Sequence, residues 1–527
     1  MIPGAMQPYA LTLDKFIDHA AKWHGATEVV TGGDAPARIG YAALRERANR
    51  LSGAFAELGL RPGDHLATLA WNSQAHMECW YGAMGIGVVC HTLNPRLSVA
   101  HLAVMIQQAE DRVLAVSPGL ASLVQELVEQ CPTIEHVVLL DEPGMDHPAP
   151  VVPRATLWAY EDLLDTHGTV MPWGGFDETS PAGLCFTSGT TGAPKGVTYT
   201  HRSNYLETVH LLQADVIGMT SRDVVMVAVP MFHANGWGLA FAGPAVGAKL
   251  VLPGRNQDGA SLTRLINQEG VTIAVGVPTV WLGLIDHVEA TGEELPSLRR
   301  VVLGGSSVPQ ALMDRIEQRL GVVVQTSWGM TELSPLGTIS PASEPVRDAT
   351  RSGRPPIGVD LRLTDNTGLP LSSQRGAEGC LWVRGASVVE RYYGQTEPVT
   401  DAEGWFDTGD LATIDATGNL RITGRAKDLI KSGGEWINPG EIEAIVGALP
   451  GVALVAVIGR AHPKWGERPV LVVEPRQGAE VSDDMLVGAL KGRIANWWMP
   501  DAIVRLSAMP LAMTGKIDKI RLRAEHG

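Results

Sequence analysis

The sequence predicts a multidomain protein of mixed α/β and α+β class. We expect two α/β subdomains and a β-rich subdomain, followed by a small, mobile α+β domain at the C-terminus. Between about residues 12 and 330, short runs of Val, Ile and Leu alternate with longer stretches of helical period, which favours parallel sheets covered on both faces. Beyond residue 350 the pattern changes to short strands and tight turns, and after Gly424 to a mixture of helix and strand.

The α/β part of the chain contains two successive runs of apolar strands. A long helical pattern at 41–59 precedes the first run, as expected when helices alternate with buried strands. The two runs predict two α/β subdomains. The expected strands are 65–71, 88–94, 112–117 and 136–141 in the first run, and 223–230, 272–278, 299–306 and 322–329 in the second.

The rest of the chain divides at a charged segment. TDNTG at 364–368 and DATGN at 415–419 are typical of turns between neighbouring strands, and they place a β-rich subdomain before the segment. After it, the pattern predicts helices at 442–449 and 483–498 and strands at 454–459 and 468–474. We therefore expect an N-terminal domain over 1–424, a hinge at 425–430 and a C-terminal domain over 431–527.

Composition and charge exclude several classes of protein. The 527 residues are 45% hydrophobic and 19% charged, which is typical of a globular protein with large cores. A net charge of −15 argues against nucleic acid as a partner. The five Cys are far apart and form no CxxC pair, so we expect no disulfide or zinc site and a cytoplasmic location. The N-terminus lacks a signal-peptide pattern, and Pro and Gly interrupt the apolar stretch 224–252, so no membrane segment is expected.

The strongest motif follows an expected strand and reads TSGTTGAPKG at 187–196. Its glycines let the backbone approach a ligand closely, while its hydroxyls and its lysine supply hydrogen-bond donors and a positive charge. This composition predicts a cradle for phosphate groups, although the spacing does not fit the P-loop of NTPases. The residues expected to bind phosphate are Thr187, Ser188, Gly189, Thr190, Thr191, Gly192 and Lys195.

This string resembles the phosphate-binding loop of the adenylate-forming (AMP-binding) superfamily, which comprises acyl-CoA synthetases, nonribosomal peptide adenylation domains and firefly luciferases. The resemblance covers essentially the whole chain, because further motifs follow in order. At closer range the chain is similar to bacterial medium-chain fatty-acid–CoA ligases and 3-methylmercaptopropionate–CoA ligases, although GGSSVP and WGERP depart from their usual GGSACP and WDERP. The motifs are PMFHANGWG (230–238), GGSS (304–307), SWGMTE (327–332), GWFDTGDLA (404–412), GRAKDLIKSGGEWI (424–437) and PLAMTGKI (510–517).

The resemblance implies ATP, Mg²⁺ and CoA as the small molecules of the reaction. A substrate carboxylate attacks the α-phosphorus of ATP and expels pyrophosphate, so catalysis depends on positioning and on positive charge. By resemblance, Glu332 binds Mg²⁺, Thr331 binds the α-phosphate, and Lys516 bridges the substrate carboxylate and that phosphate. Asp410 and Arg425 resemble the groups that bind the ribose. The residues expected around the adenine are Gly304, Gly305, Ser306, Trp328, Gly329 and Met330.

The same resemblance assigns the acyl and thiol sides of the site. His233 stands where the family carries an aromatic residue that gates the acyl and thiol channels, and Lys427 stands at the hinge. Gly329 leaves open a floor that acetate-specific members close with Trp, so we expect an apolar pocket for longer acids. The residues expected to contact CoA are Lys431, Gly433, Gly434 and Trp436. The residues expected to line the acyl pocket are Trp237, Val277, Trp281, Val308 and Leu336.

These assignments imply an ATP-dependent carboxylate–CoA ligase. The expected partner is a small uncharged carboxylic acid: a short- or medium-chain fatty acid, a thioether acid of the methylthiopropionate kind, or an aryl-alkyl acid. The alternative is a stand-alone adenylating enzyme that loads a carrier protein or an amine. A non-catalytic nucleotide-binding protein is a third reading, against which the combined presence of Lys195, Glu332, Asp410, Arg425 and Lys516 argues. The quaternary state stays open, with a homodimer as one candidate.

Overall fold

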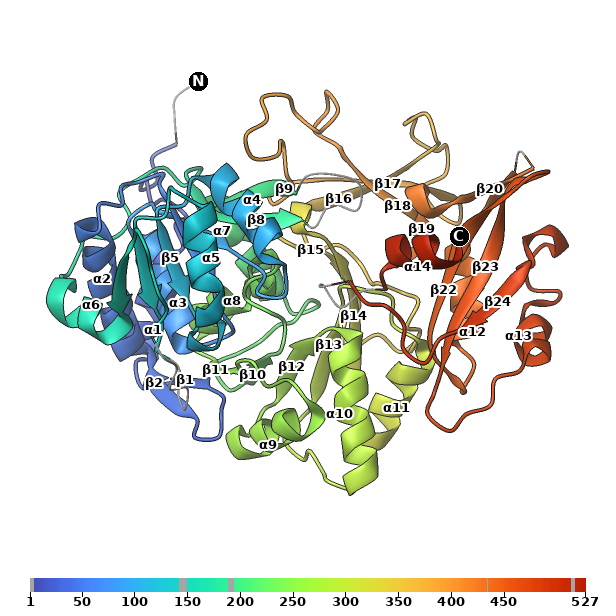
Figure 1. Cartoon of the computed structure of the whole chain (residues 1–527), viewed down its shortest axis with the longest axis horizontal. Coiled ribbons are helices and arrows are strands. Elements are labelled where there is room, and N and C mark those ends of the chain that lie inside the picture. The colour runs from blue at the N-terminus through green and yellow to red at the C-terminus, as the bar shows by residue number, and fades with distance from the viewer. Residues whose placement is uncertain (1–3, 142–148, 188–193, 434, 513–516) are drawn as a thin grey trace.

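The structure of the protein, a computed structural model, describes residues 4–141, 149–187, 194–433, 435–512 and 517–527. Figure 1 shows two large sheets with their helices at one end of the molecule and a smaller C-terminal unit at the other. This arrangement confirms the predicted fold class. No helix among the described residues is both long and apolar enough to cross a membrane.

The first large sheet is built mainly from the first predicted run of strands. Its strands are β3 (His65–Leu69), β4 (Val89–Thr92), β5 (Val113–Val116), β6 (His136–Leu139), β7 (Thr156–Ala159), β8 (Pro181–Thr187) and β9 (Lys195–Thr200). They lie in the order β7-β6-β5-β3-β4-β8-β9, and neighbours are parallel except for the antiparallel pair β8–β9. The β8–β9 hairpin places the predicted phosphate loop at one edge of this sheet.

The second large sheet combines the second run of strands with two strands from near the N-terminus. Its strands are β1 (Glu28–Thr31), β2 (Ala37–Gly40), β10 (Val224–Val227), β11 (Lys249–Leu252), β12 (Ile273–Gly276), β13 (Arg300–Leu303), β14 (Val323–Gly329) and β15 (Leu336–Ile339). They lie in the order β15-β14-β13-β12-β10-β11-β1-β2. The two predicted subdomains therefore exist, but the N-terminal hairpin joins the second sheet, which the order of strands along the chain does not indicate.

Helices cover both faces of each sheet, and one helical layer is shared. Alternate residues of β10 and of the position after it point to opposite cores: Val225 and Val227 pack in one cluster, Met226 and Ala228 in another. The cluster that holds Val225 also holds residues of the first sheet and of α1, α2, α3 and α8, so these helices lie between the sheets. The helices are α1 (Asp14–Trp23), α2 (Tyr41–Glu57), α3 (Gln74–Gly85), α4 (Val99–Ala109), α5 (Val124–Gln130), α6 (Tyr160–His167), α7 (His201–Leu211), α8 (Leu239–Val246), α9 (Gly259–Glu269), α10 (Pro278–Thr291) and α11 (Gln310–Leu320).

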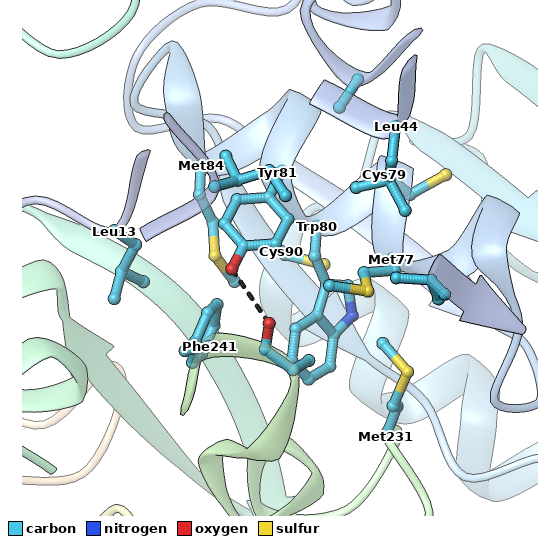
Figure 2. Packing of buried hydrophobic residues seen from close by; sticks show 14 of the residues in the cluster. Leu13, Leu44, Met77, Cys79, Trp80, Tyr81, Met84, Cys90, Met231 and Phe241 are labelled. Carbon is cyan, nitrogen blue, oxygen red and sulfur yellow. Dashed lines mark hydrogen bonds between the residues drawn. The ribbon is translucent and has the colours of Figure 1, made fainter. Parts of the chain in front are cut away.

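Helix α3 shows what a position between two sheets requires. Every residue from Ala75 to Gly85 is buried, so the helix is packed on all sides, and its polar residues His76 and Glu78 make hydrogen bonds inside the protein. Figure 2 shows Trp80 and Tyr81 of α3 beside Phe241 of α8. The Tyr81 hydroxyl donates a hydrogen bond of 2.9 Å to the Ala240 carbonyl, which satisfies its only polar atom inside the core.

The β-rich subdomain and the C-terminal unit follow as predicted, with one correction. Strands β16 to β19 form an antiparallel sheet in sequence order, and β18 and β19 are joined by the DATGN turn. The helix predicted at 483–498 is wrong beyond Leu490, because Lys491 is extended and Gly492 has φ +72°. The elements are β16 (Val359–Thr364), β17 (Glu378–Gly385), β18 (Phe406–Ile414), β19 (Leu420–Arg425), β20 (Ile430–Ser432), β21 (Glu435–Ile437), α12 (Pro439–Gly447), β22 (Val452–His462), β23 (Gly466–Pro475), α13 (Asp483–Leu490), β24 (Ala502–Arg505) and α14 (Lys519–His526).

Candidate active site

The phosphate loop closes the β8–β9 hairpin. Thr187 and Lys195 are paired in the register of the two strands, and the Thr187 hydroxyl donates a hydrogen bond of 3.4 Å to the Lys195 carbonyl. The ends of the loop are therefore held together, as a phosphate cradle requires. The loop residues between them lie outside the described residues, namely Ser188, Gly189, Thr190, Thr191 and Gly192.

A tyrosine connects the loop lysine to the predicted metal carboxylate. The Nζ atom of Lys195 lies 4.9 Å from the centroid of the Tyr392 ring. The Tyr392 hydroxyl donates a hydrogen bond of 3.0 Å to Oε1 of Glu332. Burial and the neighbouring Glu332 raise the pKa of Tyr392, so its hydroxyl stays a donor at neutral pH. The structure thus brings Lys195 and Glu332 to one place.

The segment that carries Thr331 and Glu332 is fixed on both sides. It forms a short 3₁₀ turn, η3 (Thr331–Leu333), directly after β14. The Tyr199 hydroxyl donates a hydrogen bond of 2.8 Å to the Thr331 carbonyl, and the Val389 N–H donates one of 2.8 Å to the Glu332 carbonyl. These bonds hold the backbone, and they leave the hydroxyl of Thr331 and the carboxyl of Glu332 for other partners.

The donor set at Glu332 fits Mg²⁺ bound together with a nucleotide. Glu332 is a largely buried carboxylate, 8% exposed. No group of three or more His, Cys, Asp or Glu that could hold a metal occurs in the part of the chain that the structure describes. Mg²⁺ usually takes one or two carboxylates and completes its shell with phosphate oxygens and water. A single carboxylate beside a phosphate loop meets this requirement, whereas a resident metal ion held by the protein alone would need more ligands.

The two predicted ribose residues form an ion pair. Nε of Arg425 lies 2.7 Å from Oδ1 of Asp410, and Asp410 is 1% exposed. The Trp328 indole Nε1–H donates a hydrogen bond of 2.9 Å to Oδ2 of the same carboxyl group. Asp410 and Arg425 face each other across β18 and β19, which explains the proximity of residues fifteen positions apart in the sequence. Trp328, Asp410 and Arg425 are thus held as one unit beside η3.

The glycines of the predicted adenine loop lie against a tryptophan of the predicted acyl pocket. A β-carbon built on Gly304 would lie 2.9 Å from the Trp237 ring, and one on Gly305 would lie 3.3 Å from a methyl group of Val277. Gly305 also has φ +82°, a conformation that glycine adopts without strain. The structure therefore brings Trp237 and Val277 together at the carboxyl end of β13, next to the loop expected to bind adenine.

The packing around Gly329 explains why this position is a glycine, which the sequence alone does not reveal. A β-carbon at this position would lie 2.1 Å from the Pro335 carbonyl oxygen. The close approach also lets the Met330 N–H donate a hydrogen bond of 3.0 Å to that oxygen. Gly329 is therefore required by the backbone of the following segment, in addition to any open floor it leaves in the pocket.

The remaining predicted pocket residues are not equivalent. Leu336 begins β15 and is 9% exposed, and Val308 is partly buried against the second core. Trp281 is fully buried in that core, among residues of α9 to α11, and its part in the pocket stays a prediction. His233 lines a cavity of about 20 Å³ together with six residues, room for about one water molecule. The six residues are Thr92, Asn94, Leu97, Met105, Phe186 and Phe232.

Comparison with known proteins identifies the family to which this chain belongs. The AMP-binding enzyme family matches residues 16–393, and the AMP-binding enzyme C-terminal domain matches residues 441–516. The chain belongs to the AMP-binding enzyme family. It is 42% identical to the 3-methylmercaptopropionyl-CoA ligase of Ruegeria lacuscaerulensis, over 99% of this chain and 98% of that protein. It is 40% identical to the medium-chain-fatty-acid–CoA ligase of Ectopseudomonas oleovorans, over 99% of this chain and 97% of that protein.

Solved structures agree with this membership. The crystal structure of ATP-bound MatB from Rhodopseudomonas palustris matches with a TM-score of 0.83 at 25% identity, covering 98% of this chain and 99% of that one. The anthranilate CoA ligase AuaEII in complex with anthranoyl-AMP matches with a TM-score of 0.87 at 23% identity, covering 98% of each chain, and it supports the fold. The fold of this AMP-binding enzyme thus extends over both parts of the chain.

The predicted CoA residues of this AMP-binding enzyme lie apart from the nucleotide residues. Lys431 and Trp436 are cross-strand partners in the β20–β21 hairpin, with Nζ of Lys431 5.5 Å from the Trp436 ring centroid. Gly433 packs under Trp465, whose ring would lie 2.8 Å from a β-carbon there. Figure 1 shows β20 well away from β14 and β15. Gly434 and Lys516 lie outside the described residues.

The predicted hinge residue lies in a tight turn between the two parts of the enzyme. Lys427 belongs to the 3₁₀ turn η4 (Ala426–Asp428), which follows Arg425 directly. Burial lowers the pKa of Lys427 from its usual range. The next residue, Asp428, forms a 2.8 Å ion pair with Arg523 of α14. The last helix of the chain is therefore attached to the segment expected to bend.

Two tyrosines were missed by sequence reasoning. Tyr392 links Lys195 to Glu332, and Tyr199 holds the Thr331 carbonyl. Both lie outside the glycine-rich and acidic strings that identified the site. The available signal was weak: Tyr199 stands between two threonines in the strand after the phosphate loop, and Tyr392 belongs to a pair of tyrosines before the DTGD string.

Proposed function

We propose that this AMP-binding enzyme is a carboxylate–CoA ligase that works through an acyl-adenylate, converting ATP, an acid and CoA to acyl-CoA, AMP and pyrophosphate. The observation that carries the proposal is the linked set Lys195, Tyr392 and Glu332 beside Thr331. The Asp410–Arg425 ion pair is bonded to Trp328, three residues before Thr331 in the chain. Full-length similarity to proteins named as CoA ligases supports the thiol as the acyl acceptor.

The chemistry of the first step explains these side chains. The carboxylate oxygen forms a bond to the α-phosphorus while the bond to pyrophosphate breaks, and negative charge grows on the phosphate oxygens. Mg²⁺, held by Glu332 and the phosphates, would neutralise part of that charge. Lys195 supplies a further positive charge at the base of the loop, and Lys516 would bridge the reacting groups. Asp410 would bind the ribose hydroxyls, with Arg425 and Trp328 fixing the direction of its carboxyl group.

The second step needs the other face of the C-terminal domain. In the resulting adenylate the CoA sulfur attacks the acyl carbon, and AMP leaves. We propose that the domain of residues 431–527 rotates about the hinge 425–430, so that the β20–β21 hairpin replaces the Lys516 segment at the site. The present position of β20, away from β14, suits the first step (Figure 1). Lys431, Gly433, Gly434 and Trp436 would then meet the pantetheine or the phosphates of CoA, while His233 gates the channel.

The substrate is proposed to be an uncharged short- or medium-chain fatty, thioether or aryl-alkyl acid. Trp237 and Val277 form an apolar wall next to Gly304 and Gly305. Burying an unpaired charged tail against such a wall is costly, whereas each buried CH₂ contributes about 0.8 kcal/mol. The names of the relatives, which include methylmercaptopropionate and medium-chain fatty acid ligases, agree with this class.

CoA-dependent release of AMP across a panel of acids tests the proposal. The panel comprises acetate, straight-chain acids of increasing length, methylthiopropionate, arylpropionates, amino acids and dicarboxylates. We expect acyl-CoA from the uncharged longer acids and little from the others. Adenylate formation with transfer only to an amine or a carrier protein would support the alternative enzyme, which the named relatives do not favour. A cytoplasmic location and a homodimer remain proposals, for cell fractionation and size-exclusion chromatography to test.

A further inference from the structure

Helix α7 places a carboxyl group inside the protein at Glu207. The side chain of Glu207 is 1% exposed. Its Oε1 accepts a hydrogen bond of 3.2 Å from the Leu336 N–H. Its Oε2 lies 3.4 Å from Nδ1 of His210, an ion pair when that imidazole is protonated, but it accepts no hydrogen bond from the described residues. A buried carboxyl oxygen without a partner costs free energy, so its presence in a packed interior requires a reason.

The surroundings of Glu207 coincide with the expected acyl pocket. Leu336, which bonds its first oxygen, is one of the residues assigned to the pocket from the sequence. Helix α7 also packs against η2 (Ala234–Gly238), the turn that carries Trp237. A β-carbon at Gly238 would lie 4.0 Å from Cγ of Glu207. The carboxyl group is thus held between the turn and β15, the same two segments that bring Trp237 and Leu336 to the pocket. A carboxyl group at this place would be an exception to the apolar lining predicted from the sequence.

We propose that Glu207 is a specificity-determining residue of the acyl pocket, and that the preferred acid carries a hydroxyl group that donates a hydrogen bond to its Oε2. The inference rests on the proposed ligase function and narrows its substrate class. An oxygen of a carboxyl group can accept this bond whether or not the group is ionised. Burial raises the pKa of Glu207, opposed by His210 and the Leu336 N–H. An ammonium group would bring a second charge against Trp237 and Leu336, so a neutral donor suits the site better.

Matched acids test the inference directly. Each straight-chain acid is compared with its terminally hydroxylated counterpart and with the methyl ether of that hydroxyl, and 3-phenylpropionate with its 4-hydroxy and 4-methoxy forms. The measurement is kcat/KM for CoA-dependent AMP formation, by the purified full-length enzyme. We expect the best hydroxylated acid to exceed both its alkyl and its ether partner by roughly tenfold, the effect of one buried hydrogen bond.

Two substitutions separate the pocket role from a structural one. Glu207→Leu should remove the preference for the hydroxyl. The ratio of kcat/KM for the hydroxylated acid to kcat/KM for the alkyl acid should fall roughly tenfold. Glu207→Gln keeps an acceptor for the Leu336 N–H but offers a donor in place of Oε2. The kcat/KM for the ether acid should therefore rise relative to that for the hydroxylated acid. The control Val209→Ala changes a side chain on the exposed side of α7, and it should leave both ratios as in the wild type.

The outcomes distinguish this inference from the proposed function. Acyl-CoA formed from plain alkyl acids as readily as from hydroxylated ones, with the same ratio in the wild type and in Glu207→Gln, would overturn the role of Glu207 and leave the ligase intact. A preference for an aminated acid that disappears in Glu207→Leu would also overturn the hydroxyl assignment. A wild-type enzyme that makes acyl-CoA from no acid would remove the proposed function and the inference with it.

Discussion

Among single residues, the Trp328 indole connects the expected ribose ligand with the strand that carries the pocket residue Leu336. Its Nε1–H is bonded to Asp410, the expected ribose ligand, and its ring packs over Gly337, where a β-carbon would come within 2.3 Å. The strand that begins at Leu336 also bonds Glu207. Residues assigned to the nucleotide side and to the acyl side of the site therefore meet at one packed strand.

Asp410 gives the first residue-scale prediction. Asp410→Asn keeps the size of the side chain but removes the charge paired with Arg425 and one acceptor for ribose. We expect the KM for ATP to rise roughly ten- to a hundredfold, the effect of losing a charged hydrogen bond, while the KM for the acid changes little. Initial rates of pyrophosphate exchange, with ATP varied in one series and the acid varied in another, measure the two constants. Asp407→Asn, in the same strand but exposed, is the matched control; an equal effect of both substitutions would contradict the ribose assignment.

His76 in α3 gives a prediction for stability against pH. Its Nδ1 lies 3.0 Å from the Trp71 carbonyl, and its Nε2 accepts a hydrogen bond from the Trp80 indole, so the folded state holds the ring neutral. Burial lowers the pKa of His76 to about 4, from an ordinary 6.5. The unfolded chain therefore binds more protons between these values, and stability is lost as the pH falls through that window. His76 alone should contribute a loss of about 2 kcal/mol by pH 5.

Urea unfolding of the full-length enzyme at pH 7.5 and at pH 5 measures this loss of stability. The variant His76→Gln should be less stable than the wild type at pH 7.5, because it loses the hydrogen bonds of the imidazole ring to Trp71 and Trp80. It should then lose less stability on acidification, since the titrating group is gone. His201, whose pKa burial also lowers to about 4, remains in both proteins and gives both a residual dependence of the same sign. Equal losses in wild type and variant would contradict the assignment to His76.

At the scale of elements, the turn η4 is the point where the enzyme is expected to bend. Residues in a 3₁₀ turn have φ near −60°, close to the value that proline imposes. Lys427→Pro should therefore restrict φ at this position and impede rotation about it. We predict that adenylate formation is kept and thioester formation is lost. Lys427→Ala, which removes the ammonium group but leaves the backbone free, should keep both steps.

The two steps are measured separately. Pyrophosphate exchange with the acid reports the first step, and thioester formed from a synthetic acyl-adenylate and CoA reports the second. If Lys427→Pro abolishes the first step before the second, the hinge assignment is wrong.

Lys516 provides the opposite pattern. Its ammonium group is expected to act only while the carboxylate attacks phosphorus. Lys516→Ala should reduce pyrophosphate exchange by orders of magnitude and still convert a supplied acyl-adenylate to thioester. Equal damage to both steps would mean that one orientation of the C-terminal domain serves the whole reaction.

Sequence patterns predicted where strands and helices occur along the chain better than they predicted which strands pair in space. The apolar runs around Val225 and Val301 are strands, as expected, because a buried parallel strand reads as a continuous apolar segment. The pairing of β1 with β11 could not be predicted, since a strand near residue 30 carries no mark of its partner near residue 250. The end of α13 was missed because Gly492, with its positive φ, stands among residues that continue a helical pattern.

The site was predictable where a local string carries the chemistry. Lys195, Glu332, Asp410 and Arg425 all belong to such strings. The structure links Lys195 to Glu332 through Tyr392 and pairs Asp410 with Arg425, while their roles stay predictions. Glu207 could not be recognised, because one glutamate in a helix is usually a solvent-facing residue. Only tertiary packing shows that it is buried and bonded to the backbone of a strand 129 positions away.

For the whole molecule, the two-step mechanism requires that the acid becomes an acyl-adenylate before it meets CoA. In that route one carboxylate oxygen bonds to phosphorus and leaves with AMP, while the other stays in the acyl group. Acid labelled with oxygen-18 in both carboxylate positions, turned over with ATP and CoA, tests this directly by mass spectrometry of the products. We predict AMP that carries one labelled oxygen and acyl-CoA that carries the other. Label in inorganic phosphate with release of ADP, or acyl-CoA formed with unlabelled AMP, would contradict the account.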